Sequence, residues 1–298
     1  MPDSVDLSGG DGWRRSREWG LAEVWKVYKI RVTTDTSSYS GISVIAINRP
    51  DRKNAVDPLT AKALYEAILV FEDDPKQKVC VLTGTGSSFC AGADLHKVAQ
   101  ANDDKPGDNL QPIAGRNLGP MGPSRLIIKK PIICAISGYA VAGGLELSLL
   151  ADMRVVEEDA VFGVFCRRWG VPLIDGGTVR LQAIVGLGRA LDMILTGRPV
   201  SAQEALAMGL ASRVVPKGES LKEAIGIARQ LITFPELCLN TDRQSCYYSV
   251  YEASSFQDAM SQEFNAGSKV ISQEAIAGAA KFSKGSGRHG SFKDHSKL

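Results

Sequence analysis

The sequence predicts an α/β fold followed by a helical C-terminal region. Segments typical of strands alternate with helical segments early in the chain, and helical segments alone fill the last third. The 298 residues are 44% hydrophobic and 23% charged, which is typical of a globular protein with its own core. The net charge of +2 indicates no nucleic-acid partner. No apolar run is long enough to cross a membrane.

The first strands and the first helix follow from local patterns. Residues 25–34 (WKVYKIRVTT) and 42–50 (ISVIAINRP) each alternate in the way of one strand, and the serine-rich segment DTSSYSG joins them. Asp57 is a favourable cap for the next helix, with Pro58 at its first position. Its apolar face comprises Leu64, Ala67, Ile68 and Phe71.

Two later segments read as buried strands, and a long insert separates them. VCVLTG (79–84) and PIICAISG (131–138) are continuously apolar, as strands inside a parallel sheet are. The insert, residues 100–124, is too long and polar for a plain connection and predicts a mobile loop over a site. Further on, Ser201-x-x-Glu204 and Ser220-x-x-Glu223 have the spacing of helix-capping boxes.

Each buried strand is followed by a turn of small residues. These turns lie in GTGSSFCAGADL (84–95) and GYAVAGGLEL (138–147). Main-chain N–H groups exposed at such turns can hold an anion or a developing oxyanion. Either turn alone is better read as a tight strand–helix connection. The second turn leads to Glu146, an acid in an apolar run, where an unpaired carboxylate costs several kcal/mol or takes up a proton.

Taken together, these segments resemble a known family. NRPDRKNAV, SSFCAGADL and KPIICAISGYAVAGGLELSLLADMRV occur in the order and spacing of the enoyl-CoA hydratase/isomerase (crotonase) superfamily, and the resemblance spans residues 25–290. It implies a spiral of repeated ββα turns with a C-terminal helical trimerisation region, assembled as a homotrimer or hexamer. It implies an acyl-CoA thioester as substrate, with no metal and no separate cofactor.

The resemblance also implies roles for individual residues. The amides of Ala93 and Gly143 match the family's oxyanion hole. The residues that match its substrate-binding loops are Ala91, Gly92, Asp94, Leu95, His96 and Gly144, although His96 replaces a common lysine. Glu146 matches the glutamate that handles the water. An alternative for Glu146 is a structural ion pair with an arginine.

A second family glutamate is missing, which leaves the reaction open. Cys166 lies at its position, and a thiol with an ordinary pKa near 8.5 does not hold water as a carboxylate does. Cys166 is therefore either a secondary catalytic group or a small buried filler. Asp175 resembles the location of an aspartate in dienoyl-CoA isomerases, and equally suits a cap for the helix that follows Gly176-Gly177.

Three functions follow as hypotheses. The first is hydration of a 2-enoyl-CoA through Glu146, with Asp175 or Cys166 secondary. The second is an enoyl- or dienoyl-CoA isomerase that uses Glu146 and Asp175. The third, which Cys166 favours, is a non-catalytic acyl-CoA-binding protein.

The chain is expected to have four parts and a peroxisomal location. These parts are a flexible polar extension (1–24), an α/β core (25–215), a helical region (216–284) and a flexible tail (285–298). The tail ends in Ser296-Lys297-Leu298, the tripeptide read by the peroxisomal import receptor. Six unpaired cysteines fit a reducing compartment. Such placement indicates fatty-acyl metabolism or a specialised, secondary-metabolite acyl pathway.

Overall fold

A computed structural model describes residues 23–27, 30–34, 41–99 and 110–285 of the chain. The extension, the start of the polar insert and the Ser296-Lys297-Leu298 tail therefore lie outside the described residues. Within the described part, no helix is both long and apolar enough to span a bilayer.

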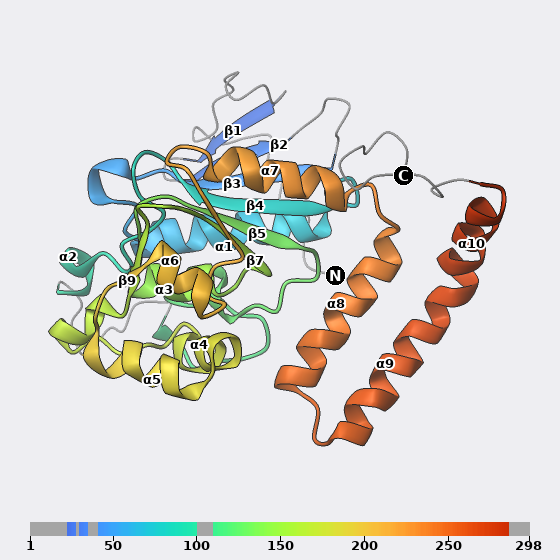
Figure 1. Ribbon diagram of the computed structural model, residues 1–298. Coiled ribbons are helices and arrows are strands. Elements are labelled where there is room, and N and C mark those ends of the chain that lie inside the picture. Colours follow the sequence, from blue (N-terminus) through green and yellow to red (C-terminus); the bar gives the residue numbers. More distant parts are fainter. Residues whose placement is uncertain (1–22, 28–29, 35–40, 100–109, 286–298) are drawn as a thin grey trace.

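A seven-stranded sheet forms the centre of the molecule (Figure 1). Along this sheet the first two strand pairs are antiparallel, and the remaining four pairs are parallel. In spatial order the strands are β1 (Glu23–Val27), β2 (Ile30–Thr34), β3 (Ile42–Ile47), β4 (Val79–Gly84), β5 (Ile132–Ile136), β7 (Met153–Glu157) and β10 (Arg213–Val215).

A smaller sheet and ten α-helices complete the described structure. The smaller sheet comprises β6 (Tyr139–Val141), β8 (Val161–Gly163) and β9 (Val200–Ser201). The helices are α1 (Pro58–Asp73), α2 (Leu95–Val98), α3 (Gly143–Ser148), α4 (Gly177–Val185), α5 (Leu187–Thr196), α6 (Ala202–Ala207), α7 (Ser220–Leu231), α8 (Glu236–Tyr251), α9 (Phe256–Val270) and α10 (Ile276–Ser283). This is the predicted α/β architecture with a helical C-terminal region.

Two strand predictions were wrong. WKVYKIRVTT forms two antiparallel strands, with Val27 opposite Ile30, rather than one. Between the two strands the sequence has Tyr28-Lys29, which contains none of the residues that typically mark a turn. The last third is not helical alone, because β9 and β10 each add a short strand to a sheet edge. Strands of two or three residues are too short to show a period.

The two faces of the large sheet pack into separate cores. Ile45 and Leu82 point to the α1 side and belong to the larger apolar cluster. Val44 and Val81 point to the opposite face, where α7 packs with Ala224 and Ala228. This alternation is what a two-sided sheet requires, and it places the two faces in different chemical surroundings.

The capping predictions for Asp57 and Ser201 are confirmed, and the one for Ser220 is wrong. The carboxylate of Asp57 accepts a hydrogen bond from Thr60 N, and Ser201 Oγ accepts one from Glu204 N, as predicted. Ser220 does not cap α7. The helix already begins at Ser220, and its hydroxyl donates instead to Glu157 Oε1 at 2.9 Å.

Candidate active site

Two turns carry the predicted oxyanion donors, and they lie side by side. Cys90 N donates to Tyr139 O at 2.9 Å, and Val141 N donates back to Cys90 O at 3.1 Å. The turns then approach closely at Gly92, which has φ +97°. A Cβ placed on Gly92 would lie only 3.0 Å from Gly143 N. Glycine is required here by both the backbone conformation and the contact.

The amides of Ala93 and Gly143 are free of protein acceptors in the described part of the chain. Val56 N donates to Gly92 O, and Asp94 N donates to Val56 O, each at 2.8 Å. This pairing leaves the amide between them, that of Ala93, facing away from Val56. Gly143 is the first residue of α3, where a helix leaves its N–H groups without partners. Both amides are therefore available to an acceptor from outside the protein.

The second turn is held in a strained conformation. Ala142 has φ +53° and ψ −126°, a region that residues with a Cβ rarely adopt. Its N–H donates to Gly163 O at 2.8 Å, which anchors the turn to β8. Strain of this kind persists where the surrounding contacts fix the backbone, and it is concentrated at functional sites.

Glu146 lies on α3, one turn after Gly143, and is 3% exposed. Its Oε1 accepts hydrogen bonds from Asp175 N at 3.0 Å and Gly177 N at 2.9 Å. Burial, followed by the charge of Asp175, raises the pKa of Glu146 to about 7. The carboxyl group is thus oriented by two amides and can give or take a proton near neutral pH.

The alternative of an ion pair between Glu146 and an arginine does not match these contacts. Arg180 is the arginine that influences Glu146 electrostatically. Its guanidinium donates to main-chain carbonyls instead, those of Ser124 at 2.6 Å and Leu126 at 3.0 Å. The acceptor capacity of Glu146 Oε1 is used by main-chain amides.

Asp175 does not cap α4, because Gly176 is the capping residue and no side chain fills that role. The Asp175 carboxylate is 4% exposed and accepts hydrogen bonds from Met121 N, at 2.9 Å, and from the Ser124 hydroxyl. Burial raises its pKa. The main-chain N–H of Asp175 donates to Glu146, and the Asp175 carboxylate accepts from the end of the polar insert. Asp175 therefore connects the insert to the candidate base.

Cys166 lies in a short 3₁₀ segment, Phe165–Trp169, and is 7% exposed. Burial raises the pKa of its thiol, and the charge of Glu146 raises it further. The structure therefore places Cys166 near Glu146 as a protonated, buried thiol at neutral pH. A buried, weakly polar thiol of this kind is what the filler alternative describes.

The predicted substrate-binding residues surround the first turn. Ala91 and Asp94 flank the glycine of the turn, and Asp94 forms an ion pair with Arg49 at 2.8 Å. Leu95 is 42% exposed, and His96 is exposed beside it on α2. Gly144 abuts the carbonyl of Cys90, so its lack of a side chain serves packing. Acyl-CoA binding by these residues stays a prediction.

Ser124, Arg180 and the amide of Met121 were not predicted as parts of the site. Ser124 and Met121 lie in the polar insert, more than 50 residues from Asp175. Met121 also covers the second turn, because a Cβ on Gly143 would lie 2.7 Å from its sulfur. No local pattern marks such partners. Arg180 lies in GGTVRL (176–181), directly after Asp175, and this closeness in sequence was the available signal.

Asp175→Asn is expected to move the acid limb of the kcat/KM profile to lower pH. The charge of Asp175 raises the pKa of Glu146, so its removal lowers that pKa and keeps the base ionised in more acidic solution. The measurement is kcat/KM from pH 5 to 9, with Asp73→Asn as a control for loss of an exposed carboxylate. An unmoved limb with activity lost at every pH would contradict this assignment and make Asp175 itself the proton donor.

Comparison with known proteins agrees with this geometry. The profile of the enoyl-CoA hydratase/isomerase family matches residues 37–283. An enoyl-CoA hydratase of Mycobacterium tuberculosis is 36% identical over 192 residues, which cover 62% of this chain and 69% of the relative. A carnitinyl-CoA dehydratase of Salmonella typhi is 36% identical over 200 residues, covering 65% and 72%. The crystal structure of an enoyl-CoA hydratase from Mycobacterium tuberculosis H37Rv superposes with a TM-score of 0.75 at 30% identity, covering 86% of this chain and 96% of that one.

Proposed function

Because the chain belongs to the enoyl-CoA hydratase/isomerase family, we propose that it adds water across the 2,3 double bond of a 2-enoyl-CoA thioester. The observation that carries this proposal is the pairing of two features. The first is a pair of amides, those of Ala93 and Gly143, which lie on adjoining turns and have no protein acceptors in the described part of the chain. The second is the buried carboxyl of Glu146, which has a pKa near neutrality and lies on the helix that Gly143 begins.

The proposed reaction uses Glu146 as both base and acid. The thioester oxygen accepts hydrogen bonds from Ala93 N and Gly143 N, which stabilise the enolate as charge moves onto that oxygen. Ionised Glu146 takes a proton from water while the water oxygen bonds to C3. The same carboxyl then passes that proton to C2, and the thioester carbonyl re-forms. The net change is the addition of one water, and no second carboxylate is required.

Isomerisation is the second candidate, and the raised pKa of Glu146 is the observation that favours it. A single carboxyl that can release a proton near pH 7 can also move one from C2 to C4 without water. A shuttle that uses Asp175 as well is less well supported, because that carboxylate already accepts two hydrogen bonds from the insert.

Two substrates separate the candidates. Purified protein is incubated with crotonyl-CoA and, separately, with a 3-enoyl-CoA. Hydration removes the absorbance of the conjugated thioester from the first, whereas isomerisation generates it from the second. Binding of both thioesters without turnover of either would support the non-catalytic alternative and refute the enzymatic proposal.

We further propose that the chain assembles as a homotrimer or a hexamer of two trimers. Helices α8, α9 and α10 extend from the body (Figure 1). Exposed apolar side chains on α9 and the helical segments after it are Phe256, Met260, Phe264, Ile271, Ile276 and Phe282. Apolar patches of this kind mark association surfaces in soluble proteins.

Sedimentation velocity is expected to give three or six chain masses. Phe264 is 73% exposed and Ile276 is 63% exposed. The double variant Phe264→Asp, Ile276→Asp is expected to give smaller species, because burying a carboxylate in an apolar contact is costly. A wild-type protein that sediments as one chain mass would refute the assembly.

We propose that the protein is imported into peroxisomes through Ser296-Lys297-Leu298. Substrate analysis would identify the acyl pathway that the protein serves. A fluorescent protein fused to the amino terminus of the chain is expected to enter peroxisomes in eukaryotic cells. Deletion of the last three residues is expected to leave the fusion in the cytosol. Unchanged puncta after the deletion would refute the proposal.

A further inference from the structure

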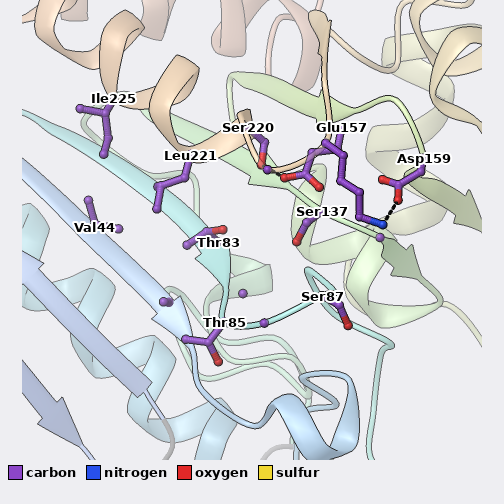
Figure 2. Close-up of a pocket in the computed structure, with 16 residues that line it drawn as sticks. Val44, Thr83, Thr85, Ser87, Ser137, Glu157, Asp159, Ser220, Leu221 and Ile225 are labelled. Atoms are coloured by element: carbon purple, nitrogen blue, oxygen red, sulfur yellow. Dashed lines mark hydrogen bonds and ion pairs between the residues drawn. The ribbon is translucent and has the colours of Figure 1, made fainter. Parts of the chain in front are cut away.

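A cavity lies on the face of the large sheet that packs against α7. Its volume is about 700 Å³, and it opens between the start of α7 and the carboxyl ends of β3 and β4 (Figure 2). Val44 and Thr83 line it from the sheet, whereas their neighbours Ile45 and Leu82 point into the other core. The size is that of small-molecule sites, and carboxyl ends of parallel strands are where such sites form.

One side of the cavity is apolar and the other carries an acid. Leu221 and Ile225 of α7 face Val44 across the cavity (Figure 2). On the other side Glu157 is 6% exposed, and the hydroxyl of Ser220 is the one hydrogen-bond partner of its carboxylate in the described part of the chain. A carboxylate buried to this degree, with a single neutral donor, has acceptor capacity left for a ligand.

The other charges of the cavity cancel. Lys217 Nζ forms an ion pair with Asp159 Oδ2 at 2.6 Å, and the Lys217 side chain is 72% exposed. Glu157 therefore leaves one uncompensated negative charge among the lining residues. That charge disfavours phosphates and carboxylates, so the acyl-CoA substrate does not fit this cavity, and it favours a cation.

We propose that this cavity is a second ligand site, which takes a small amphipathic amine. The apolar part of the amine contacts Val44, Leu221 and Ile225, and its ammonium group donates to Glu157. A hydroxyl such as that of Ser137, which also lines the cavity, is a further acceptor for the ammonium.

The site adjoins the catalytic turns through shared loops. Ser87 and Gly138 line the cavity, and the chain continues from them into the turns that carry Ala93 and Gly143. The two loops are joined by a hydrogen bond from Phe89 N to Ser137 O at 2.7 Å. An amine bound in the cavity therefore contacts the segments that set the spacing of the oxyanion donors.

Three probes that share a cyclohexane ring and differ in their head group test the proposal. Cyclohexylamine, cyclohexanol and cyclohexanecarboxylate are titrated separately into the full-length protein, with excess coenzyme A present to occupy the substrate site. Ligand-observed saturation-transfer NMR gives the three dissociation constants. We expect the amine to bind most tightly, the alcohol more weakly and the carboxylate not at all.

Two variants locate the binding. Glu157→Gln is expected to weaken binding of the amine about tenfold, which is the effect of losing a charge-assisted hydrogen bond, and to leave the dissociation constant of the alcohol unchanged. Ile225→Trp fills the cavity and is expected to abolish binding of both. Leu59→Trp, at a position on α1 that is 69% exposed, is the matched control and is expected to change neither.

Several results would overturn the proposal. Among wild-type measurements these are no binding of the amine and a preference for the carboxylate. Unchanged amine binding in Ile225→Trp would do so as well. None of these readouts depends on turnover, so they are independent of the proposed hydratase activity.

Discussion

Replacing Glu146 by glutamine is expected to lower the rate of crotonyl-CoA hydration about a thousandfold, within the range for loss of a general acid–base group. Glutamine keeps an oxygen that can accept from Asp175 N and Gly177 N, so the local geometry is preserved. It removes only the ability to take and return a proton. The decay of the conjugated-thioester absorbance under saturating substrate measures the effect.

Stability provides the control for this variant. The pKa of Glu146 is raised in the folded protein, from 4.5 to about 7, so folding favours its protonated form. The stabilisation relative to the ionised form is complete below pH 4.5 and is lost as the pH rises through 7. Glu146→Gln should therefore match the wild type in acid and exceed it by a few kcal/mol at pH 8, by denaturant titration. An active, less stable variant would show that the carboxyl serves structure instead.

Replacing Gly92 by alanine is expected to lower hydration about a hundredfold, as for loss of one oxyanion donor. The new Cβ would lie 2.9 Å from Ala142 Cβ and 3.0 Å from Gly143 N, so the two turns must separate. The separation moves the amide of Gly143 relative to that of Ala93, and one of the two hydrogen bonds to the thioester oxygen is lost. The fall should be in kcat, because the oxyanion contact is strongest in the transition state.

Gly209→Ala is the matched control for Gly92→Ala. Gly209 also has a positive φ, +81°, but its Cβ would meet nothing closer than 3.9 Å. The backbone cost of alanine in a left-handed conformation is about 1–2 kcal/mol and is common to both variants. Equal loss of kcat in the two proteins would show that general destabilisation, and not the oxyanion hole, causes the effect at Gly92.

The candidate acid and the two turns were accessible from the sequence because each is a local signal. Small residues directly after a buried strand indicate a sharp turn with exposed main-chain amides, and an acid in an apolar run needs a hydrogen-bond donor or a proton. The absence of a second glutamate was equally visible, since Cys166 occupies its position in FGVFC. The function of Asp175 was not accessible. Both a cap and a proton carrier fit its sequence context.

The sequence by itself determined the α/β class, the place of Glu146 and the turns that present Ala93 and Gly143, because these depend on neighbours a few residues apart. Tertiary structure alone decided that the Asp175 carboxylate accepts hydrogen bonds from Met121 and Ser124, which are 54 and 51 residues away. It also decided that the Ser220 hydroxyl donates to Glu157, 63 residues away. Hydrogen-bond partners so distant along the chain are chosen by how the sheet and helices pack, and no periodicity records that choice.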